Sequence, residues 1–303
     1  MMKAGFIGCG NMGTAMVSGI LKKGLLNKDE IIVSNLTEAG AARSREKLGV
    51  VVTMDNREVA AKSRILFLAV KPQFYEEVIK EIRDLLTEDQ ILVGIAPGKT
   101  LQWLEETCAR SMKIVRLMPN TPAQVGEGMT SVCINEKVTE EDARQIRELT
   151  DSFGRTEFIP ERLMDAAGAV SGSSPAYVFM FIEAMADAAV AQGMPRKQAY
   201  AFAAQAVLGS AKMVLETGMH PGELKDMVCS PAGTTIEGVR MLEKAGMRSA
   251  VFEALNACAE KGKRLKGNAF YGYTACHEGL DKMYIQNTMF LYILTLNKVL
   301  SEI

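Results

Sequence analysis

The segment Gly8-Cys9-Gly10-Asn11-Met12-Gly13 has the pattern GxGxxG and directly follows the apolar run Ala4–Ile7. In a strand–turn–helix unit, the first glycine of this pattern allows a tight turn and the second lets a pyrophosphate approach the backbone. The third lets the helix pack closely on the strand. Free N–H groups at the helix start then bind the phosphates. The segment predicts a dinucleotide site rather than a merely structural turn.

The end of the second predicted strand indicates which dinucleotide binds. NAD enzymes place Asp or Glu there for the ribose 2′-hydroxyl, whereas this strand ends Val33-Ser34-Asn35-Leu36. A 2′-phosphate is not repelled at such a position, and Ser34 and Asn35 offer hydrogen-bond donors to it. We therefore expect NADPH as the preferred cofactor, with NADH used at lower efficiency. Arg43 and Arg45 lie further along the next helix and support this choice only weakly.

Three predicted strands end in segments that contain proline. Ligands bind at the carboxyl edge of the sheet in folds that alternate strands and helices. A proline after a strand often only ends the strand, but three on one edge predict a rigid rim around the cofactor. The segments are Ala69-Val70-Lys71-Pro72, Ile95-Ala96-Pro97-Gly98 and Met118-Pro119-Asn120-Thr121-Pro122.

Two segments later in the chain combine small and hydroxyl residues before a predicted helix. They are Ser171-Gly172-Ser173-Ser174-Pro175 and Ser230-Pro231-Ala232-Gly233-Thr234-Thr235. Hydroxyls and free N–H groups at two helix starts would form a pocket for an anion, although ordinary helix capping explains the same residues equally well. Cys229 lies beside the second helix start and is interpreted as an inert thiol rather than an activated one.

Other residues that could do acid–base or metal chemistry are few. Glu183 and Asp187 lie one turn apart in an apolar helical stretch, where a polar stripe or an interface pair is favoured over an acid–base pair. His220 and His277 are the two histidines of the chain, which is little material for a histidine metal site or a Ser/His/Asp triad. We expect no metal site.

Composition limits the class of protein. The 303 residues are about twice the usual domain length of roughly 150 residues, which predicts two domains. Lys and Arg number 35 against 36 Asp and Glu, a net charge of -1, so we expect small-molecule partners or other subunits rather than nucleic acid or a membrane. The N-terminus shows no signal peptide separate from the fold, which favours the cytoplasm.

The first half alternates short apolar runs with helical patterns. Val/Ile/Leu runs without polar alternation are typical of strands covered on both faces, and strands alternating with helices predict right-handed crossovers and a parallel sheet. We expect an α/β, doubly wound domain over residues 1–160. The strands after the first are expected at 31–33, 50–52, 65–70, 91–95 and 114–118.

The second half has a different pattern. Long helical stretches rich in Ala and Met, at 176–192, 196–216 and 248–266, predict an all-helical domain over residues 161–268 that dimerises. Residues 269–303 differ again in composition and form an atypical C-terminal extension. Its uncharged stretch 283–297 is too short to span a bilayer, so a packing or interface helix is favoured.

The assembled pattern resembles pyrroline-5-carboxylate reductase, the last enzyme of proline biosynthesis. The resemblance runs from FIGCGNMG through AVKPQ, MPNTP and SGSSPAYVF to LKDMVCSPAGTTIEGV, and it ends near Lys266. The segment Ser230–Thr235 carries it most specifically. Ser174 and Ala232 depart from the pattern, because they stand where the family usually has glycine.

The resemblance implies an N-terminal Rossmann-like domain, a helical dimerisation domain and homodimers of interleaved helices, often assembled into decamers. It implies NADPH-dependent hydride transfer to the C=N bond of 1-pyrroline-5-carboxylate, which gives L-proline. Thr235 would be the catalytic partner of the ring nitrogen, and Glu161, Gly233 and Thr234 would bind the substrate with it. The expected cofactor contacts are Gly8, Cys9, Gly10, Asn11, Met12, Gly13, Ser34, Asn56, Ala69, Val70, Lys71, Pro72, Ile95, Ala96 and Asn120.

The chemistry of imine reduction agrees with these residues. A cyclic imine needs a hydride at carbon and a proton at nitrogen, and its iminium form is already electrophilic. A hydroxyl that orients the nitrogen and helix N–H groups that hold the carboxylate are therefore sufficient, without a strong protein acid.

Two other functions stay open. A reductase of hydroxy acids, related to 6-phosphogluconate dehydrogenase, would use a catalytic lysine, but Lys197, Lys212 and Lys225 all lie outside the Ser/Gly motif. A non-catalytic relative that binds a nucleotide is disfavoured by the pair Thr234-Thr235. The rate of NADPH oxidation with pyrroline-5-carboxylate, compared with hydroxy and keto acids, separates these functions.

Overall fold

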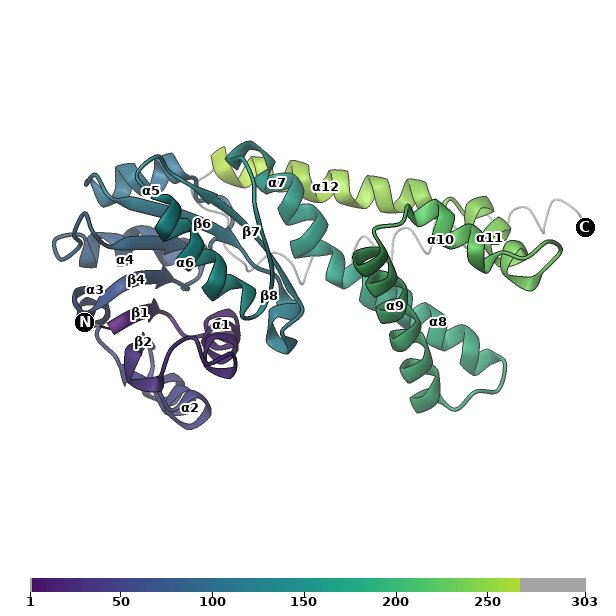
Figure 1. Ribbon diagram of the computed structural model, residues 1–303, viewed down its shortest axis with the longest axis horizontal. Helices are drawn as coiled ribbons and strands as arrows, with labels where there is room; N and C mark the ends of the chain where they lie inside the picture. Colours follow the sequence, from purple (N-terminus) through teal and green to yellow (C-terminus); the bar gives the residue numbers. More distant parts are fainter. Residues whose placement is uncertain (1, 268–303) are drawn as a thin grey trace, which may run out of the picture. The chain divides into compact units, whose positions relative to one another are not determined.

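An eight-stranded sheet forms the core of the first half of the chain (Figure 1). The computed structural model describes residues 2–267. The strands are β1 (Met2–Ile7), β2 (Ile31–Ser34), β3 (Val51–Thr53), β4 (Ser63–Leu68), β5 (Ile91–Gly94), β6 (Lys113–Met118), β7 (Gly128–Ile134) and β8 (Gly154–Phe158). They lie in the order β3-β2-β1-β4-β5-β6-β7-β8, and all neighbours are parallel except β6 and β7.

The direction in which the strands are added reverses beside β1. The chain builds β2 and β3 on one side of β1 and then returns to place β4 on the other side. At such a switch point a crevice opens outside the carboxyl ends of the strands, and ligands bind there. The glycine-rich turn follows β1 and the segment Ala69–Pro72 follows β4, so both lie at the switch point. The predicted doubly wound α/β fold is confirmed.

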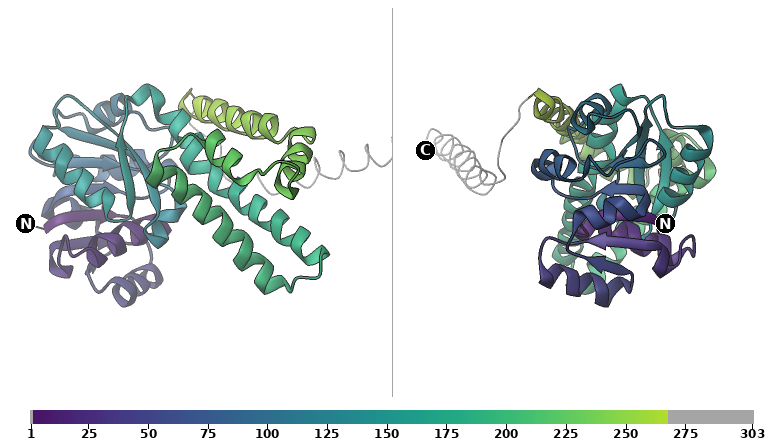
Figure 2. Two further views of the ribbon diagram at one scale, coloured as in Figure 1. Left: turned by 45° about the vertical axis from the view of Figure 1, so that its right-hand side comes forward. Right: turned by 90° about the vertical axis from the view of Figure 1, so that its left-hand side faces the viewer.

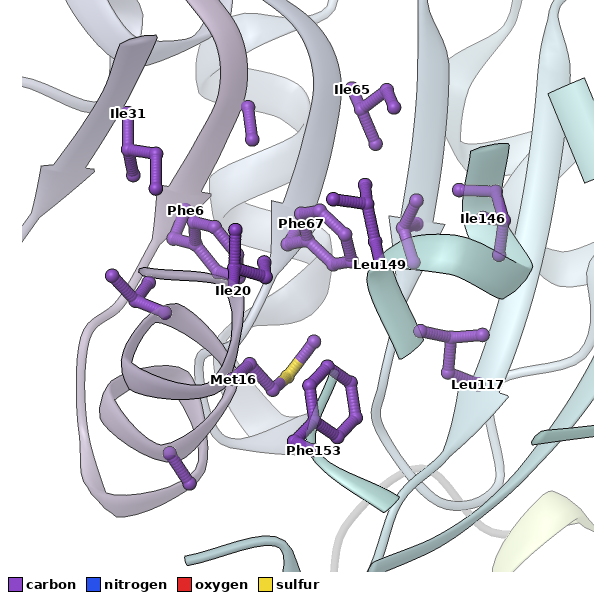
Figure 3. Close-up of a cluster of buried hydrophobic side chains, with 14 of the residues drawn as sticks. Phe6, Met16, Ile20, Ile31, Ile65, Phe67, Leu117, Ile146, Leu149 and Phe153 are labelled. Carbon is purple, nitrogen blue, oxygen red and sulfur yellow. The ribbon is translucent and has the colours of Figure 1, made fainter. Parts of the chain in front are cut away.

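Helices cover both faces of this sheet and bury a core on each. One core contains Phe6 and Phe67, whose rings stack with centroids 4.4 Å apart (Figure 3). The other contains Ile7 and Tyr75. Because successive residues of β1 enter opposite cores, the strand is apolar throughout instead of alternating. The helices here are α1 (Asn11–Lys22), α2 (Glu38–Leu48), α3 (Asn56–Lys62), α4 (Tyr75–Ile82), α5 (Leu101–Cys108) and α6 (Glu140–Asp151).

Strands β7 and β8 are not among the strands expected from the sequence. β7 runs antiparallel to β6, so the prediction of a wholly parallel sheet is wrong at this pair. β8 forms the end of the sheet, and Phe158 is the one large apolar residue in its sequence GRTEF. Arg155 and Glu157 are exposed, while Thr156 is buried. An edge strand needs only one buried face, and such a short polar alternation does not stand out from loop sequence.

The chain from Met164 to Gly267 is helical. Among residues 161–267 the structure has no strand, in agreement with the prediction of a helical second half. Pro195 directly precedes the helix α9, and Gly218 with φ of +66° ends it. The helices are α7 (Met164–Ala167), α8 (Ser174–Ala191), α9 (Arg196–Thr217), α10 (Pro221–Val228), α11 (Thr234–Lys244) and α12 (Met247–Gly267).

Helices α8 and α9 form a hairpin (Figure 2). Across its turn, Asp187 is ion-paired with Arg196, whose guanidinium lies 5.6 Å from the centroid of the Tyr200 ring. Asp187 therefore has a structural partner, which favours the polar pair over the acid–base alternative. Glu183, one turn earlier, is exposed.

Large apolar side chains on the α8–α9 hairpin are exposed in the single chain. Phe179, Met180, Phe202 and Leu215 are each more than 60% exposed. The helical stretch Glu161–Ala191 is also long and apolar enough to cross a membrane by length and composition alone. An apolar surface of this kind equally fits a partner protein that covers it.

The C-terminal extension lies outside the described residues. The predictions for 269–303, including a packing helix at 283–297, therefore stay predictions, and Cys276 and His277 fall in the same segment.

Candidate active site

The three glycines of the turn after β1 have different surroundings. Gly8 has φ of +86°, and a Cβ placed on it would lie 2.7 Å from Val70 Cγ1. A Cβ on Gly13 would lie 2.8 Å from the carbonyl oxygen of Gly8. The Cβ position of Gly10, in contrast, has no atom of another segment within 4 Å. Gly8 and Gly13 thus serve the turn and the helix packing, and Gly10 leaves room for a phosphate group.

The start of α1 has the properties of an anion site. Its N-cap is Gly10, which has no side chain to cap the helix, and its first turn carries no acidic residue. Thr14 N donates to Gly10 O over 2.8 Å in the first bond of the helix. The N–H groups before Thr14, in the first turn of α1, point out of the helix end. They carry the positive end of the helix dipole. These groups and the open space at Gly10 fit the pyrophosphate of a dinucleotide.

Backbone hydrogen bonds align the carboxyl ends of three neighbouring strands. Gly8 N donates to Ser34 O over 3.2 Å, and Ala69 N donates to Ile7 O over 2.8 Å. The structure thereby brings together the glycine-rich turn, Ser34 and the segment Ala69–Pro72, all of them expected cofactor contacts. Lys71 stands exposed at the start of a short 3-10 helix, Pro72–Phe74.

Tyr75 links the ends of β4 and β5. Its hydroxyl is buried, donates to Leu68 O, and accepts hydrogen bonds from Ile95 N at 2.8 Å and Ala96 N at 3.0 Å. Burial raises the pKa of Tyr75 above its ordinary value, so the hydroxyl keeps its proton. The expected cofactor contacts Ile95 and Ala96 are thus held by a residue that the sequence motifs did not reveal.

Ser34, Asn56 and Glu81 form a hydrogen-bonded row at the end of β2. The Ser34 hydroxyl donates to Asn56 Oδ1 over 2.7 Å, and Asn56 Nδ2 donates to Glu81 Oε2 over 2.9 Å. Ser34 is 1% exposed. Two expected cofactor residues are therefore in contact, but the hydroxyl proton expected to face a 2′-phosphate is bound to Asn56 instead.

The other side chains considered for the 2′-phosphate differ in their partners. Asn35 Nδ2 donates to Cys9 O over 3.3 Å, and Asn35 Oδ1 is buried without a hydrogen-bond partner within residues 2–267. Arg45 is paired with Glu38 at 2.6 Å. Arg43 is exposed on the same helix. Arg43 and Arg45 therefore still give only weak support to the choice of NADPH over NADH.

The segment Ser171–Pro175 lies within a helix, and the prediction of a free helix start there is wrong. Residues Gly168–Ser173 form a π-helical turn that joins α7 to α8 without a break, and Pro175 is in the first turn of α8. The hydroxyls of Ser171 and Ser174 donate back to the carbonyls of Ala167 and Val170. Proline is common in the first turn of a helix, so Pro175 in the sequence indicates a helix start. The π turn that joins the two helices has no sequence pattern that would have revealed their continuity.

The segment Ser230–Thr235 does lead into a free helix start. Gly233 is the N-cap of α11 and provides no side-chain cap, and Thr234 and Thr235 are exposed in its first turn. Gly233 is packed against Ser230, whose Oγ would lie 2.4 Å from an added Cβ. Ala232 has φ of +54°, a left-handed conformation that favours glycine. The departure from glycine at this position therefore carries backbone strain.

Glu161 joins the helical half of the chain to the sheet edge. Its Oε1 accepts from Leu101 N, the first residue of α5, over 2.8 Å and from Arg116 Nη1 over 3.0 Å. Arg116 lies in β6 and is 1% exposed, and its Nε and Nη2 atoms have no partner within residues 2–267. Arg116 belongs to no sequence motif. It is a charged residue within an apolar strand, and its partner Glu161 lies 45 residues later in the chain, so the pair is recognisable only in the folded structure.

The candidate cofactor and substrate segments are not bonded to each other in the part of the chain that the structure describes. Within residues 2–267, no hydrogen bond or ion pair connects Ser230–Thr235 to the strand ends of the sheet. In the same residues, no group of three or more His, Cys, Asp or Glu side chains is placed to hold a metal ion.

Comparisons with known proteins extend over most of the chain. Residues 161–265 match the family model described as pyrroline-5-carboxylate reductase dimerisation, and residues 3–98 match that of NADP oxidoreductase, coenzyme F420-dependent. A pyrroline-5-carboxylate reductase of Escherichia coli K12 is 52% identical over 263 residues, which cover 87% of this chain and 98% of the relative. The chain belongs to the pyrroline-5-carboxylate reductase family.

Solved structures agree with this assignment. A pyrroline-5-carboxylate reductase from Coxiella burnetii superposes with a TM-score of 0.82 at 33% identity, covering 87% of this chain and 98% of that one. The Plasmodium falciparum pyrroline carboxylate reductase, solved with NADP bound, gives 0.80 at 33% identity, covering 88% and 98%. The predicted pyrroline-5-carboxylate reductase family, the oxidoreductase activity and the NADPH cofactor are confirmed.

Membership in the pyrroline-5-carboxylate reductase family also accounts for the apolar surface of the helical half. The matched dimerisation model spans residues 161–265, which include the exposed apolar side chains of α8 and α9. The match supports the predicted self-association of the chain.

Proposed function

We propose that the carboxyl edge of the sheet binds NADPH and that the start of α11 binds the imine of 1-pyrroline-5-carboxylate, which is reduced to L-proline. The observation that carries this proposal is the exposed Thr234-Thr235 pair at an uncapped helix start. It provides a hydroxyl beside several N–H groups, which are the two features that a bound cyclic imino acid needs. The open space beside Gly10, at the start of α1, supports the cofactor half of the proposal.

The cofactor half of the site is assigned to residues 1–160. The N–H groups at the start of α1 would hold the pyrophosphate, and Ser34 and Asn56 would face the adenosine ribose and its phosphate. The ends of β4 and β5 would flank the nicotinamide, which supplies the hydride when NADPH is bound. The proposed contacts are Gly8, Cys9, Gly10, Asn11, Met12, Gly13, Ser34, Asn56, Ala69, Val70, Lys71, Pro72, Ile95 and Ala96. Asn120, the remaining expected contact, is not among them, because its amide is bonded within the protein at both ends.

The substrate half is assigned to residues 161–268. The N–H groups in the first turn of α11 would bind the carboxylate of the ring, next to Gly233 at the N-cap. The ring would react as its iminium form, which already carries the proton on nitrogen. The Thr235 hydroxyl would hydrogen-bond to that nitrogen and hold the ring in the orientation for hydride arrival at carbon. Thr234 and the second carboxylate oxygen of Glu161 would complete the contacts.

The two halves would come from different copies of the chain. A homodimer of interleaved helices would set α11 of one protomer against the sheet edge of the other, and the lack of bonding between these segments within residues 2–267 supports this arrangement. Dimers would assemble further into a decamer in the cytoplasm, without nucleic-acid or membrane partners. The interleaved dimer and the decamer rest on the family resemblance, and sedimentation or light scattering measures the number of copies.

Complementation of two inactive variants tests whether the site is shared. One chain carries Gly10→Glu, which would block cofactor binding. The other chain carries Thr235→Val, which would disable its substrate half. If Thr235 acts across the interface, co-refolded mixtures regain about a quarter of wild-type activity, because half of the dimers are mixed and each has one intact site. If the site lies within one chain, mixing restores nothing.

A substrate comparison tests the proposed reaction. The purified chain should oxidise NADPH rapidly with pyrroline-5-carboxylate and negligibly with hydroxy or keto acids. A higher rate with a keto acid would favour the hydroxy-acid reductase, and NADPH binding without turnover of any substrate would favour a non-catalytic relative.

A further inference from the structure

Asn120 lies in the loop after β6, at the same edge of the sheet as the cofactor segments, and its side chain is 8% exposed. Both ends of its amide are used within the protein. Asn120 Oδ1 accepts a hydrogen bond from Met129 N at 2.8 Å, and Asn120 Nδ2 donates to Ser171 O at 2.9 Å. The first bond holds the loop to the start of β7, and the second reaches the helical half of the chain.

The acceptor of the second bond is a carbonyl whose α-helical donor is missing. In an α-helix, Ser171 O would accept from the N–H four residues later. That residue is Pro175, which has no N–H. The helix widens into the π turn Gly168–Ser173 at this place, and the amide of Asn120 supplies the donor that proline lacks. Such π turns are frequent at functional sites.

We propose that Asn120 is a positioning residue that fixes the π turn at Ser171 against the sheet edge, and with it the helix that continues into α8. This inference rests on the proposed function, in which the sheet edge holds the cofactor and the helical half holds the imine. Asn120 touches neither reactant through its amide in this role. It fixes the helical half, through which the chain dimerises, against its own sheet edge, and so determines where the α11 of a second copy meets that edge. A misplacement of about 1 Å is enough to lower a rate about 100-fold.

The substitution Asn120→Asp isolates this contact. It keeps the shape of the side chain and an oxygen that accepts from Met129 N, but it replaces the donor to Ser171 O by a second oxygen, which repels the carbonyl. Asn135→Asp is the matched control. Asn135 is also 8% exposed, and its Nδ2 donates to Glu105 Oε1 at 2.9 Å and to Met112 O at 3.0 Å, away from the site.

We expect Asn120→Asp to lower kcat/KM for pyrroline-5-carboxylate about 10- to 100-fold while the Kd for NADPH changes less than about twofold. Asn135→Asp should lower the melting temperature at least as much and leave kcat/KM nearly unchanged. Asn120→Ala, which removes the donor without adding a repulsive oxygen, should show the same kinetic pattern in a milder form and serves if the aspartate variant does not fold.

Three results would overturn the inference. Equal kinetic losses in the Asn120 and Asn135 variants would make the effect one of general stability. A weaker NADPH affinity with unchanged kcat would make Asn120 a cofactor contact, and full activity in both Asn120 variants would remove it from the site. The wild-type enzyme is measured in the same assay, so a failure of the proposed function appears there, as no reduction of the imine at all.

Discussion

Arg116 Nη1 and Glu161 Oε1 lie 3.0 Å apart, which pairs a buried strand residue with the first turn of the helical half. The same carboxylate oxygen accepts from Leu101 N. The loop that carries Ile95 and Ala96 is therefore fixed at one end by Tyr75 and at the other by Glu161. One ion pair thus connects the cofactor edge to the residue at which the second half begins.

Glu161→Gln should destabilise the protein because it leaves the buried Arg116 without an opposite charge. The amide oxygen still accepts from both donors, so we expect a loss of about 1–3 kcal/mol in the free energy of unfolding, and a larger loss for Glu161→Ala. Denaturant titration measures both. Glu157→Gln, on the exposed face of β8, is the control and should have no effect, and a stability loss no greater than that of the control would contradict the role of the pair.

Gly10→Ala and Gly13→Ala should separate cofactor binding from folding. A methyl group at Gly10 meets no other segment of the protein but enters the space assigned to the pyrophosphate, so the Kd for NADPH should rise about 10-fold or more. The poorer N-cap should cost only about 0.5–1 kcal/mol of stability. A methyl group at Gly13 meets Gly8 O at 2.8 Å, so that variant should lose about 1–3 kcal/mol of stability. Fluorescence titration and thermal melts of the two variants check this. Unchanged NADPH binding by Gly10→Ala would contradict the assignment of the pyrophosphate to the space beside Gly10.

Ser34→Asp should shift cofactor preference toward NADH. The new carboxylate would repel a 2′-phosphate and accept a hydrogen bond from a free 2′-hydroxyl, as acidic residues do at this strand end in NAD enzymes. We expect the ratio of kcat/KM for NADPH to that for NADH to fall about 10-fold or more. Ser34→Ala, which only removes the bond to Asn56, is the control. An unchanged ratio in the aspartate variant would show that Ser34 does not face this part of the cofactor.

Thr235→Ala should lower kcat about 10- to 1000-fold with little effect on the Kd for NADPH, because the iminium needs orientation more than further activation. Thr235→Ser keeps the hydroxyl and should recover most of the loss. Thr235→Val keeps the shape without the hydroxyl and should stay impaired. Steady-state kinetics of the three variants show whether the hydroxyl or the shape of the side chain is needed. Full activity of the valine variant would remove Thr235 from the mechanism.

Local sequence signals predicted the parts of the fold that depend on neighbours along the chain. The strand and glycine turn from Ala4 to Gly13 were predictable because the GxGxxG spacing reflects local requirements. Gly8 and Gly13 have no room for a side chain, and Gly10 leaves space for a ligand. The start of α11 at Thr234 was predictable from the small and hydroxyl residues before it. Both are short segments whose conformation is decided within about ten residues.

The parts that sequence reasoning missed depend on distant partners. β8 pairs with β7, and Ser171 O, within the helical stretch that contains Ser171–Pro175, accepts a hydrogen bond from Asn120, about fifty residues earlier. Tyr75 and Arg116 carry no motif, and their roles appear only when the ends of β4, β5 and β6 meet. Tertiary contacts override local preference at these places.

Transfer of labelled hydride tests the central claim most directly. NADPH that carries deuterium at the transferable position of its nicotinamide ring is incubated with pyrroline-5-carboxylate and the purified chain, and the product is examined by mass spectrometry and NMR. We expect L-proline with one deuterium, bound to the ring carbon that was part of the C=N bond. Proline without deuterium, or consumption of the labelled cofactor without any proline, would contradict it.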